Sequence, residues 1–209
     1  MKQTPLLLST AYLPPLTYFV NIINCNNIVI EHFETYPKQT YRNRCEIYSA
    51  NGMLSLTIPV IKPNGNHTLT KDIEISNVNN WQKIHWRAIE SAYSSSPFFM
   101  YYRDLFYPFY EKKYKYLLDF NTNLLELIFK IFKIAVNINT TLKFEKQPIN
   151  TKDMRNAIHP KQSTDAYFGQ MPFYTQVFHD KYGFLPNLSI IDLLFNEGNF
   201  SKDYLLKIK

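Results

Sequence analysis

Glycine and cysteine are scarce in this sequence, which has 5 glycines and 2 cysteines among its 209 residues. It contains no G-x-G-x-x-G and no G-x-x-x-x-G-K-[ST] pattern, which excludes a glycine-cradled dinucleotide site and a P-loop. H-E-x-x-H, C-x-x-C and G-x-S-x-G are absent as well, so neither a zinc site nor a nucleophile elbow is predicted. We therefore expect no metal and no cofactor.

Long hydrophobic runs are also lacking. The leucine run at residues 6–8 is too short for the core of a signal peptide. Residues 124–136 are the most apolar segment, but they are too few and carry too many charges to span a bilayer. Cys25 and Cys45 lack the spacing of a metal site or a disulfide scaffold, so free thiols are expected. The sequence predicts a cytoplasmic protein without membrane insertion.

Aromatic residues and positive charge, by contrast, are abundant. The chain has 16 tyrosines, 16 phenylalanines and 2 tryptophans, and 23 basic against 17 acidic residues give a net charge of +6. Because the charge is spread along the chain, it favours an anionic small molecule as partner and argues against nucleic acid. A chain of this length buries one core, so we expect one domain over residues 1–209, with a strand-rich part at 1–78 and a helical part at 79–209.

The N-terminal part has the pattern of strand, bend, helix and strand. Residues 5–9 form a short apolar run, residues 16–24 have the length of a helix, and residues 27–33 are rich in β-branched side chains. This order predicts a Rossmann-like βαβ unit of the α/β class, with a bend at residues 10–15.

The bend is the first candidate for a site, because open α/β sheets bind ligands at the carboxyl edge of their strands. Tyr12, Pro14, Pro15 and Tyr18 are therefore candidate pocket walls. The alternative is a stiff connector in which the two tyrosines only pack.

A β-hairpin is predicted next, because Asn51-Gly52 is a strong signal for a two-residue turn. Such a turn pairs Ile47 with Leu56 and Cys45 with Ile58, all on one face. Residues 68–75 would add a third strand.

The other face of this hairpin is predicted to be cationic, because side chains alternate along a strand. Arg42, Arg44, Glu46 and Tyr48 share that face, and Lys38 lies further back with the same parity. Paired guanidinium groups suit a phosphate or carboxylate, which each can bind through two hydrogen bonds. The alternative is an exposed face of solvated charges.

Helical spacing begins after residue 78. A helix is predicted from Trp81, capped by Asn79 or Asn80, with His85 beside its apolar stripe as either a hydrogen-bonded core residue or a proton-transfer group. The aromatic residues at 93–116 predict two short helices around Pro108, and an amphipathic helix follows. No chemistry is assigned to residues 137–165.

The C-terminal part predicts a capped helix that ends at Gly198. Ser189 and Asp192 have the spacing of a capping box. Asp192 is thus either a capping residue or a base at a helix N-terminus.

Four segments of the chain resemble the WbqC-like protein family. They are LSTAYLPPLTYF (8–19), KQTYRNRCEIYSANGMLSLTIPV (38–60), NWQKIHWRAIESAYSSSPFFMYY (80–102) and FLPNLSIIDLLFNEG (184–198). Members occur among genes for O-antigen and other bacterial surface polysaccharides. The resemblance implies involvement with nucleotide-linked or amino sugars. Our leading hypothesis is a transferase on an activated sugar, which moves an acyl or aminoacyl group to a sugar amine.

The resemblance also implies one pocket built from three pieces. These are the aromatic-Leu-Pro bend, the Arg42-Asn43-Arg44 segment and the Pro-Asn-Leu-Ser run at 186–189. Many relatives have His-Gln-Pro where this chain has Ser9, Thr10 and Ala11, so this chain lacks a histidine that is a candidate acid or base in those relatives.

From these patterns we predict a substrate site for an anionic small molecule such as a nucleotide sugar. Its substrate-binding residues would be Tyr12, Pro14, Pro15, Tyr18, Lys38, Tyr41, Arg42, Asn43, Arg44, Asn187 and Ser189. His85 or Asp192 would transfer the proton. The alternative is a non-catalytic binding or assembly protein that uses the aromatic residues at 93–116.

Overall fold

A four-stranded parallel sheet organises the computed structural model, which describes residues 4–161 and 171–208. Its strands are β1 (Leu6–Ser9), β2 (Asn27–Glu31), β7 (Asn137–Thr140) and β8 (Lys152–Asp153), in the order β7-β2-β1-β8. Each neighbouring pair is parallel. Helix α1 (Leu16–Ile22) connects β1 to β2, so the α/β class and the βαβ unit are confirmed.

The strand order changes direction at β1. From β1 the chain passes to β2 and later to β7 on one side, whereas β8 is added on the other side of β1. The carboxyl ends of β1 and β8 therefore flank a topological switch point, which is where open α/β sheets form ligand crevices. The bend at residues 10–15 directly follows β1 and so lies at this edge.

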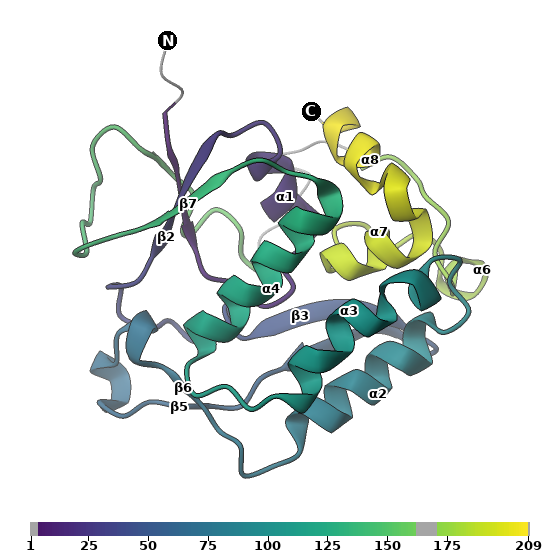
Figure 1. Ribbon diagram of the computed structural model, residues 1–209, viewed down its shortest axis with the longest axis horizontal. Coiled ribbons are helices and arrows are strands. Elements are labelled where there is room, and N and C mark those ends of the chain that lie inside the picture. The colour runs from purple at the N-terminus through teal and green to yellow at the C-terminus, as the bar shows by residue number, and fades with distance from the viewer. Residues whose placement is uncertain (1–3, 162–170, 209) are drawn as a thin grey trace.

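Most of the other helices follow the hairpin part of the chain (Figure 1). They are α2 (Trp81–Tyr93), α3 (Phe99–Glu111), α4 (Leu117–Phe132), α6 (His179–Tyr182), α7 (Ile190–Glu197) and α8 (Ser201–Lys207), with a 3-10 turn at Gly198–Phe200. Helices α2 and α3 lie side by side, and α7 packs near both α3 and α8. The helical part thus packs on the sheet and the hairpin.

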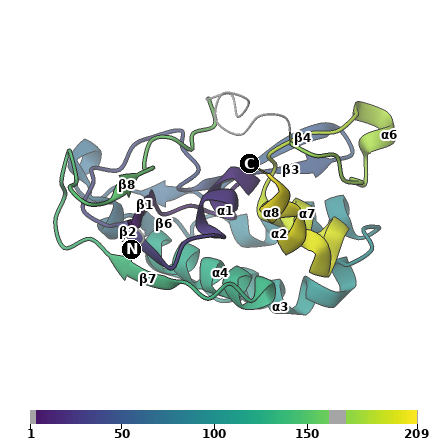
Figure 2. The same ribbon diagram turned by 90° about the horizontal axis from the view of Figure 1, so that it is seen from above.

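The two faces of the parallel sheet are covered differently (Figure 2). Leu8 and Ile30 point into the main hydrophobic core, on the side of α1 and α4. Because side chains alternate along a strand, Leu7 and Val29 point to the other face. There the connection between β7 and β8 lies over the sheet.

The hairpin of β3 (Arg44–Ser49) and β4 (Gly52–Thr57) is present, with a register two residues from the predicted one. Ile47 pairs with Leu54, and Ser49 pairs with Gly52. The turn residues are Ala50 and Asn51, because Gly52, at φ 93°, already belongs to β4. A shift of two residues keeps every side chain on its predicted face.

The predicted third strand is not part of the hairpin sheet. Residues 68–75 form a 3-10 turn (Thr70–Asp72) and β6 (Glu74–Ile75), which pairs with β5 (Val60–Ile61) in a separate ribbon after a 3-10 turn at Gly65–His67. The backbone N–H of Thr70 donates to the Glu34 carbonyl at 2.9 Å, and that of Lys71 to the His32 carbonyl at 3.0 Å. These bonds draw the segment away from β4.

The aromatic segment forms one helix where two were predicted. Helix α3 continues through Pro108, so the predicted break there is wrong. Proline removes the N–H that would bond to the Asp104 carbonyl. Asp104 and Pro108 are both exposed, so water can solvate the carbonyl that is left free.

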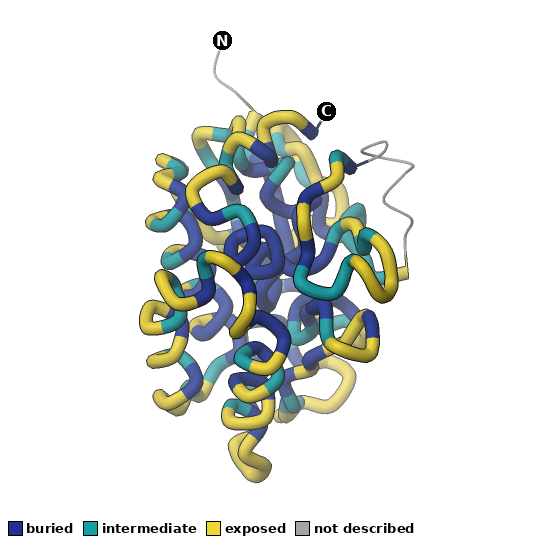
Figure 3. The backbone as a smooth tube through the Cα atoms, turned by 90° about the vertical axis from the view of Figure 1, so that its right-hand side faces the viewer, coloured by how far each residue is buried: buried dark blue, intermediate teal, exposed yellow. Residues whose placement is uncertain are grey.

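Buried positions gather in the interior of the molecule, and exposed positions lie mainly on its outer turns (Figure 3). Many of the rings from α2 and α3 are buried there. Phe99 and Phe106 contact Phe195 of α7 edge-on, with centroid distances of 5.2 and 5.7 Å. Trp86 lies 5.3 Å from the ring of Tyr110. Tyr101 is an exception, at 77% exposed. Core packing therefore explains much of the aromatic density of residues 93–116.

Two further sequence expectations concern membranes and thiols. Within the described residues, no helix is long and apolar enough to cross a membrane. Both cysteines are free, with Cys45 buried and Cys25 half-buried.

Candidate functional site

A small pocket lies at the switch point, between the carboxyl ends of β1 and β8. Its described lining residues are Ser9, Thr10, Ala11, Tyr18, Tyr41, Arg42, Met154, Arg155 and Ile158. Its volume is about 10 Å³, which is room for about one water molecule. Three of the predicted substrate-binding residues, Tyr18, Tyr41 and Arg42, line it together. We call it the switch-point pocket.

Arg42 is the central cation of the switch-point pocket, although it is only 3% exposed. Its Nε and Nη2 donate to the two carboxylate oxygens of Glu34 at 2.7 and 2.8 Å, and Nη2 also donates to Ser9 Oγ. Nη1 has no hydrogen-bond acceptor among the described residues. Since Nη1 carries two N–H groups, Arg42 keeps donors that its carboxylate partner does not use.

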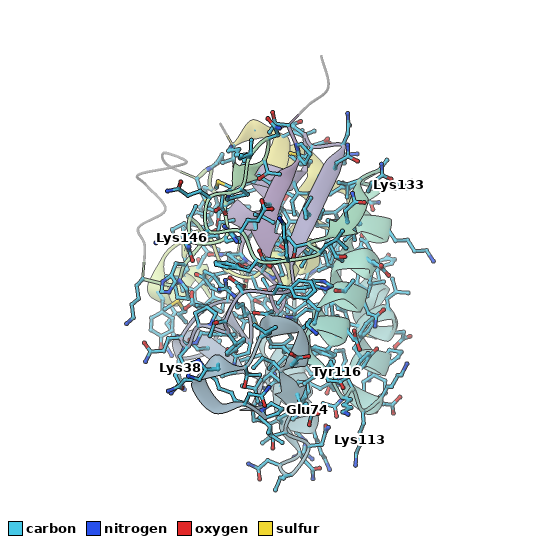
Figure 4. All side chains as sticks on the ribbon, turned by 90° about the vertical axis from the view of Figure 1, so that its left-hand side faces the viewer. Lys38, Glu74, Lys113, Tyr116, Lys133 and Lys146 are labelled. Atoms are coloured by element: carbon cyan, nitrogen blue, oxygen red, sulfur yellow. The ribbon has the colours of Figure 1, made fainter. Side chains whose placement is uncertain are left out.

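Arg42 and Arg44 do not share a strand face as predicted. Strand β3 begins only at Arg44, and Arg42 lies in the turn before it. Arg44 is half-buried and does not belong to the described lining of the pocket. Its Nε is buried without a hydrogen-bond partner among the described residues. Lys38 is exposed on the surface (Figure 4).

Arg155 supplies the second guanidinium of the switch-point pocket. It donates through Nη1 to Glu31 at 2.8 Å, and through Nε and Nη2 to the Asp153 carboxylate at 2.9 and 2.7 Å. The hydrogen bonds from Arg155 lower the pKa of Asp153. Ser9 connects the two cations, because its Oγ accepts from Arg42 and donates to the Arg155 carbonyl at 3.1 Å.

Sequence reasoning missed Arg155, and no local signal marks it. It follows β8, which has only two residues and shows no recognisable strand pattern. Its partner Glu31 is at the end of β2, more than a hundred positions away in the chain. Only the parallel pairing of β8 with β1 brings Arg155 to the pocket.

Further ionisable groups lie around the pocket. His159 follows the lining residue Ile158, and its pKa is lowered by burial and by the cations Lys161, Arg42 and Arg44. Tyr41 donates its hydroxyl to Glu46 at 3.3 Å. Burial raises the pKa of that carboxyl group, against the effects of the Tyr41 hydrogen bond and Arg44.

Tyr12 and His85 meet in the core and not at the pocket. The Tyr12 hydroxyl lies 3.0 Å from His85 Nδ1 and 2.9 Å from the Tyr110 hydroxyl. Burial lowers the pKa of His85 to about 4, so its imidazole is neutral near pH 7. Neither Tyr12 nor His85 belongs to the described lining of the switch-point pocket.

The prolyl bend is held by the C-terminal segment. Pro15 and Ser189 form an antiparallel β-bridge, and the Pro14 carbonyl accepts the N–H of Ile190 at 2.9 Å. Ser189 Oγ donates to the Leu13 carbonyl at 2.8 Å. Leu13 has φ 39°, a left-handed conformation that a non-glycine residue adopts only where its surroundings enforce it. These residues fix the shape of the bend.

Two predicted asparagines also make bonds that shape the backbone. Asn187 Oδ1 accepts the N–H of Thr17 in the first turn of α1 at 2.9 Å. Asn43 donates its Nδ2 to the Ile58 carbonyl at 2.8 Å, and its own carbonyl accepts the Ile58 N–H at 2.8 Å. Asn187 thus connects the C-terminal segment to α1, and Asn43 closes the open end of the hairpin.

Asp192 is not part of a capping box. Its buried carboxylate accepts from Tyr93 at 2.9 Å, Tyr174 at 2.6 Å and Gln176 at 2.9 Å. Burial raises the pKa of Asp192, while the three donors act to lower it. Ser189 makes no side-chain cap, because its hydroxyl is committed to the bend. Of the two predicted caps of α2, Asn79 and Asn80, Asn80 occupies the N-cap position, but its side chain makes no cap hydrogen bond.

Among residues 4–161 and 171–208, no group of three or more histidine, cysteine, aspartate or glutamate side chains is placed to hold a metal ion.

The fold and the pocket define an α/β protein with an arginine-lined crevice at its sheet edge. The model of the WbqC-like protein family matches residues 10–171, which is more than half of the chain, so the chain belongs to this family. An uncharacterized protein of Mycobacterium tuberculosis (strain H37Rv), Rv1507c, is 28% identical over 228 aligned positions that cover 98% of each chain. No solved structure matches the chain significantly.

Proposed function

We propose that this WbqC-like protein is a cytoplasmic transferase for a nucleotide-linked or amino sugar of bacterial surface polysaccharides. The switch-point pocket would hold an anionic group of that substrate. The reaction would be acyl or aminoacyl transfer from an activated ester or thioester to a sugar amine: the C–N bond forms, the bond to the alcohol or thiol leaving group breaks, and the amine proton passes to that leaving group. Membership of the family supports the polysaccharide context, because the name of the family is linked to an O-antigen locus.

One observation carries this proposal: a buried arginine with unused donors lines a crevice at the switch point. Arg42 is bound to Glu34 through Nε and Nη2, which leaves Nη1 without an acceptor among the described residues. N–H donors that the protein leaves free are normally satisfied by a ligand or by water. A phosphate or carboxylate oxygen is the acceptor that a guanidinium binds most strongly.

The size of the pocket limits what enters it. With about 10 Å³ of room, it admits one small polar group, such as a single oxygen of a phosphate. The rest of the ligand then lies outside, where the positive charges of Arg44 and Lys161 favour further anionic groups.

His85 and Asp192 have structural roles in this proposal. His85 is buried against Tyr12, and Asp192 accepts three hydrogen bonds in the interior. Neither side chain belongs to the described lining of the pocket.

Calorimetric titration with inorganic phosphate and with a panel of nucleotide sugars tests this function. The test variant is Glu34→Gln/Arg42→Gln, which removes both charges of the buried pair and avoids leaving one of them unpaired. The matched control is Glu74→Gln/Lys115→Gln, which removes an ion pair of 3.5 Å between partly exposed side chains that do not line the pocket.

We expect the wild type and the control to bind a member of the panel, and the test variant to bind it about tenfold or more weakly. Circular dichroism establishes that each variant is folded. Failure of the whole panel to bind the wild type would contradict the proposal. Equal affinities of the test variant and the wild type would do so as well.

A second candidate function is that of a non-catalytic assembly protein. Met100 and Tyr101 of α3 are 66% and 77% exposed, which leaves part of the aromatic segment available to a partner. If the partner is a second copy of the chain, sedimentation at increasing protein concentration tests this role. Association that Tyr101→Lys abolishes would favour it, and a monomer at all concentrations would count against it.

A further inference from the structure

The face of the parallel sheet away from α1 and α4 has an irregular cover. Parallel sheets normally bury both faces under helices. Here Leu7 and Val29 point from β1 and β2 towards residues 141–151, a connection without helix or strand. Figure 2 shows this connection on the opposite side of the sheet from α1 and α4.

A cavity of about 270 Å³ remains between the sheet and its cover. Its described lining residues are Leu7, Val29, Glu31, Thr141, Leu142, Lys143, Glu145, Pro148, Ile149 and Thr151. Leu7 and Val29 form its floor, and Leu142 and Ile149, which are 90% and 81% exposed, belong to its outer side. We call it the sheet-face cavity.

The charges around the sheet-face cavity cancel in pairs. Glu31 is bound to Arg155 at 2.8 Å, and Glu145 is bound to Lys143 at 3.0 Å. The cavity therefore favours a neutral ligand, whereas at the switch-point pocket Arg42 Nη1 has no acceptor among the described residues. One polar group in its lining is unsatisfied, because the buried Thr151 Oγ1 has no hydrogen-bond partner among the described residues.

The sheet-face cavity and the switch-point pocket lie on either side of one ion pair. Arg155 lines the switch-point pocket and Glu31 lines the sheet-face cavity. Two substrates of opposite character could thus approach the same sheet edge, one anionic and the other neutral and apolar.

We propose that the sheet-face cavity binds a short neutral acyl chain, which makes it the acyl subsite of the transferase; this assignment rests on the proposed function. The volume is just below the range of about 300–1,000 Å³ that holds drug-sized ligands, so it suits a chain of a few carbons. The apolar floor receives the chain, and Thr151 Oγ1 is the donor available to its carbonyl.

Saturation-transfer NMR with hexanamide, and with acetamide as the probe without a chain, tests this assignment. Val29→Phe fills the cavity from its floor, and Thr151→Val removes the hydroxyl at nearly constant shape. Val78→Phe is the matched control, because Val78 is 87% exposed and does not line the cavity. Should Val29→Phe fail to fold, Ile149→Lys alters the exposed outer side at little cost to the core.

Hexanamide should bind the wild type and Val78→Phe, and acetamide should bind neither measurably. Val29→Phe should weaken hexanamide binding about tenfold or more, and Thr151→Val about threefold to tenfold. Absence of hexanamide binding to the wild type, or equal binding to folded Val29→Phe or Ile149→Lys, would overturn the inference.

Phosphate titration of the same samples separates this inference from the proposed function. Arg42-dependent phosphate binding without hexanamide binding removes the acyl subsite and leaves the anion site. Hexanamide binding that Val29→Phe weakens, without phosphate binding, supports the cavity and removes the anion site.

Discussion

Two buried acidic centres, one beside the switch-point pocket and one in the C-terminal part, are stabilised in different ways. Glu34 is neutralised by Arg42 through two hydrogen bonds. Asp192 is held by Tyr93, Tyr174 and Gln176, three neutral donors. Both carboxyl groups lie in the interior, where an uncompensated charge is costly.

The difference between the two centres is the reason why we propose only one of them as a ligand site. At Glu34 the partner is a cation with more donors than its carboxylate can accept, so capacity for an additional anion remains. At Asp192 the donors converge on a carboxylate, and no cation forms a salt bridge with it among the described residues. The first arrangement suits binding, whereas the second connects α2 and α7 to residues 174–176.

The largest expected effect is that of breaking the Glu34–Arg42 pair from one side. Arg42→Ala leaves Glu34 buried without its cation and should lower the free energy of unfolding by about 3–5 kcal/mol. Urea denaturation measures this change. Arg44→Ala is the control, because Arg44 is half-buried and forms no salt bridge among the described residues, and it should cost less than about 1 kcal/mol. Equal losses of unfolding free energy for Arg42→Ala and Arg44→Ala would contradict a special contribution of the buried Glu34–Arg42 pair.

A pH effect of similar size is expected from His85. Its pKa is about 4 in the folded protein against 6.5 for an ordinary histidine, so the unfolded chain takes up the proton first as the pH falls. The contribution of His85 to the free energy of unfolding is fully present above pH 6.5, and it decreases by about 3 kcal/mol as the pH falls to about 4.

Denaturation of the wild type and His85→Gln across this pH range measures the effect of His85. The decrease should be largely absent in His85→Gln and retained in His67→Gln, which replaces an exposed histidine. An unchanged pH profile for His85→Gln would contradict the buried, neutral state of the ring.

The loss of one hydrogen-bond donor to Asp192 should lower the free energy of unfolding by about 1.5–3 kcal/mol. Tyr174→Phe removes the bond of 2.6 Å and should raise the pKa of Asp192 further. A raised folded-state pKa favours the folded protein at low pH, and this contribution is lost as the pH rises above the ordinary value of 3.8. The variant should therefore lose more stability, relative to the wild type, at pH 7 than at pH 4.

Chemical denaturation at these two pH values measures the loss from Tyr174→Phe. Tyr101→Phe, at an exposed position of α3, provides the matched control and should change little. An equal loss of stability at both pH values would contradict a hydrogen bond from Tyr174 to an ionised Asp192.

The smallest effect is expected for a surface pair, Glu74 with Lys115. Glu74 and Lys115 are 3.5 Å apart with side chains 31% and 66% exposed, and Figure 4 shows Glu74 near the surface. The Glu74→Gln/Lys115→Gln variant should leave the free energy of unfolding almost unchanged, as measured by urea denaturation. A loss as large as that of Arg42→Ala would show that burial does not set the strength of these pairs.

Local patterns predicted the elements whose residues interact with near neighbours. The apolar run at β1, the proline-rich bend and the faces of the hairpin follow from periodicity and turn chemistry. The predicted hairpin register was wrong because Gly52 adopts its positive φ as a residue of β4 and not as a residue of the turn.

The candidate site depends on long-range pairing, which the sequence alone does not reveal. The partner of Arg42 is Glu34, in a loop between the βαβ unit and the hairpin, and Arg155 enters the site only because β8 pairs with β1. Ser189 and Asp192 have the spacing of a capping box, yet their side chains find partners in distant segments. Tertiary contacts therefore decided the roles of these residues.

The position of a bound phosphate in a crystal of this protein tests the central claim most directly. We predict a phosphate oxygen at about 2.7–3.1 Å from Arg42 Nη1, with the Glu34–Arg42 bonds retained. Phosphate bound at Lys38 or elsewhere on the surface, with Arg42 Nη1 in contact with water alone, would contradict it.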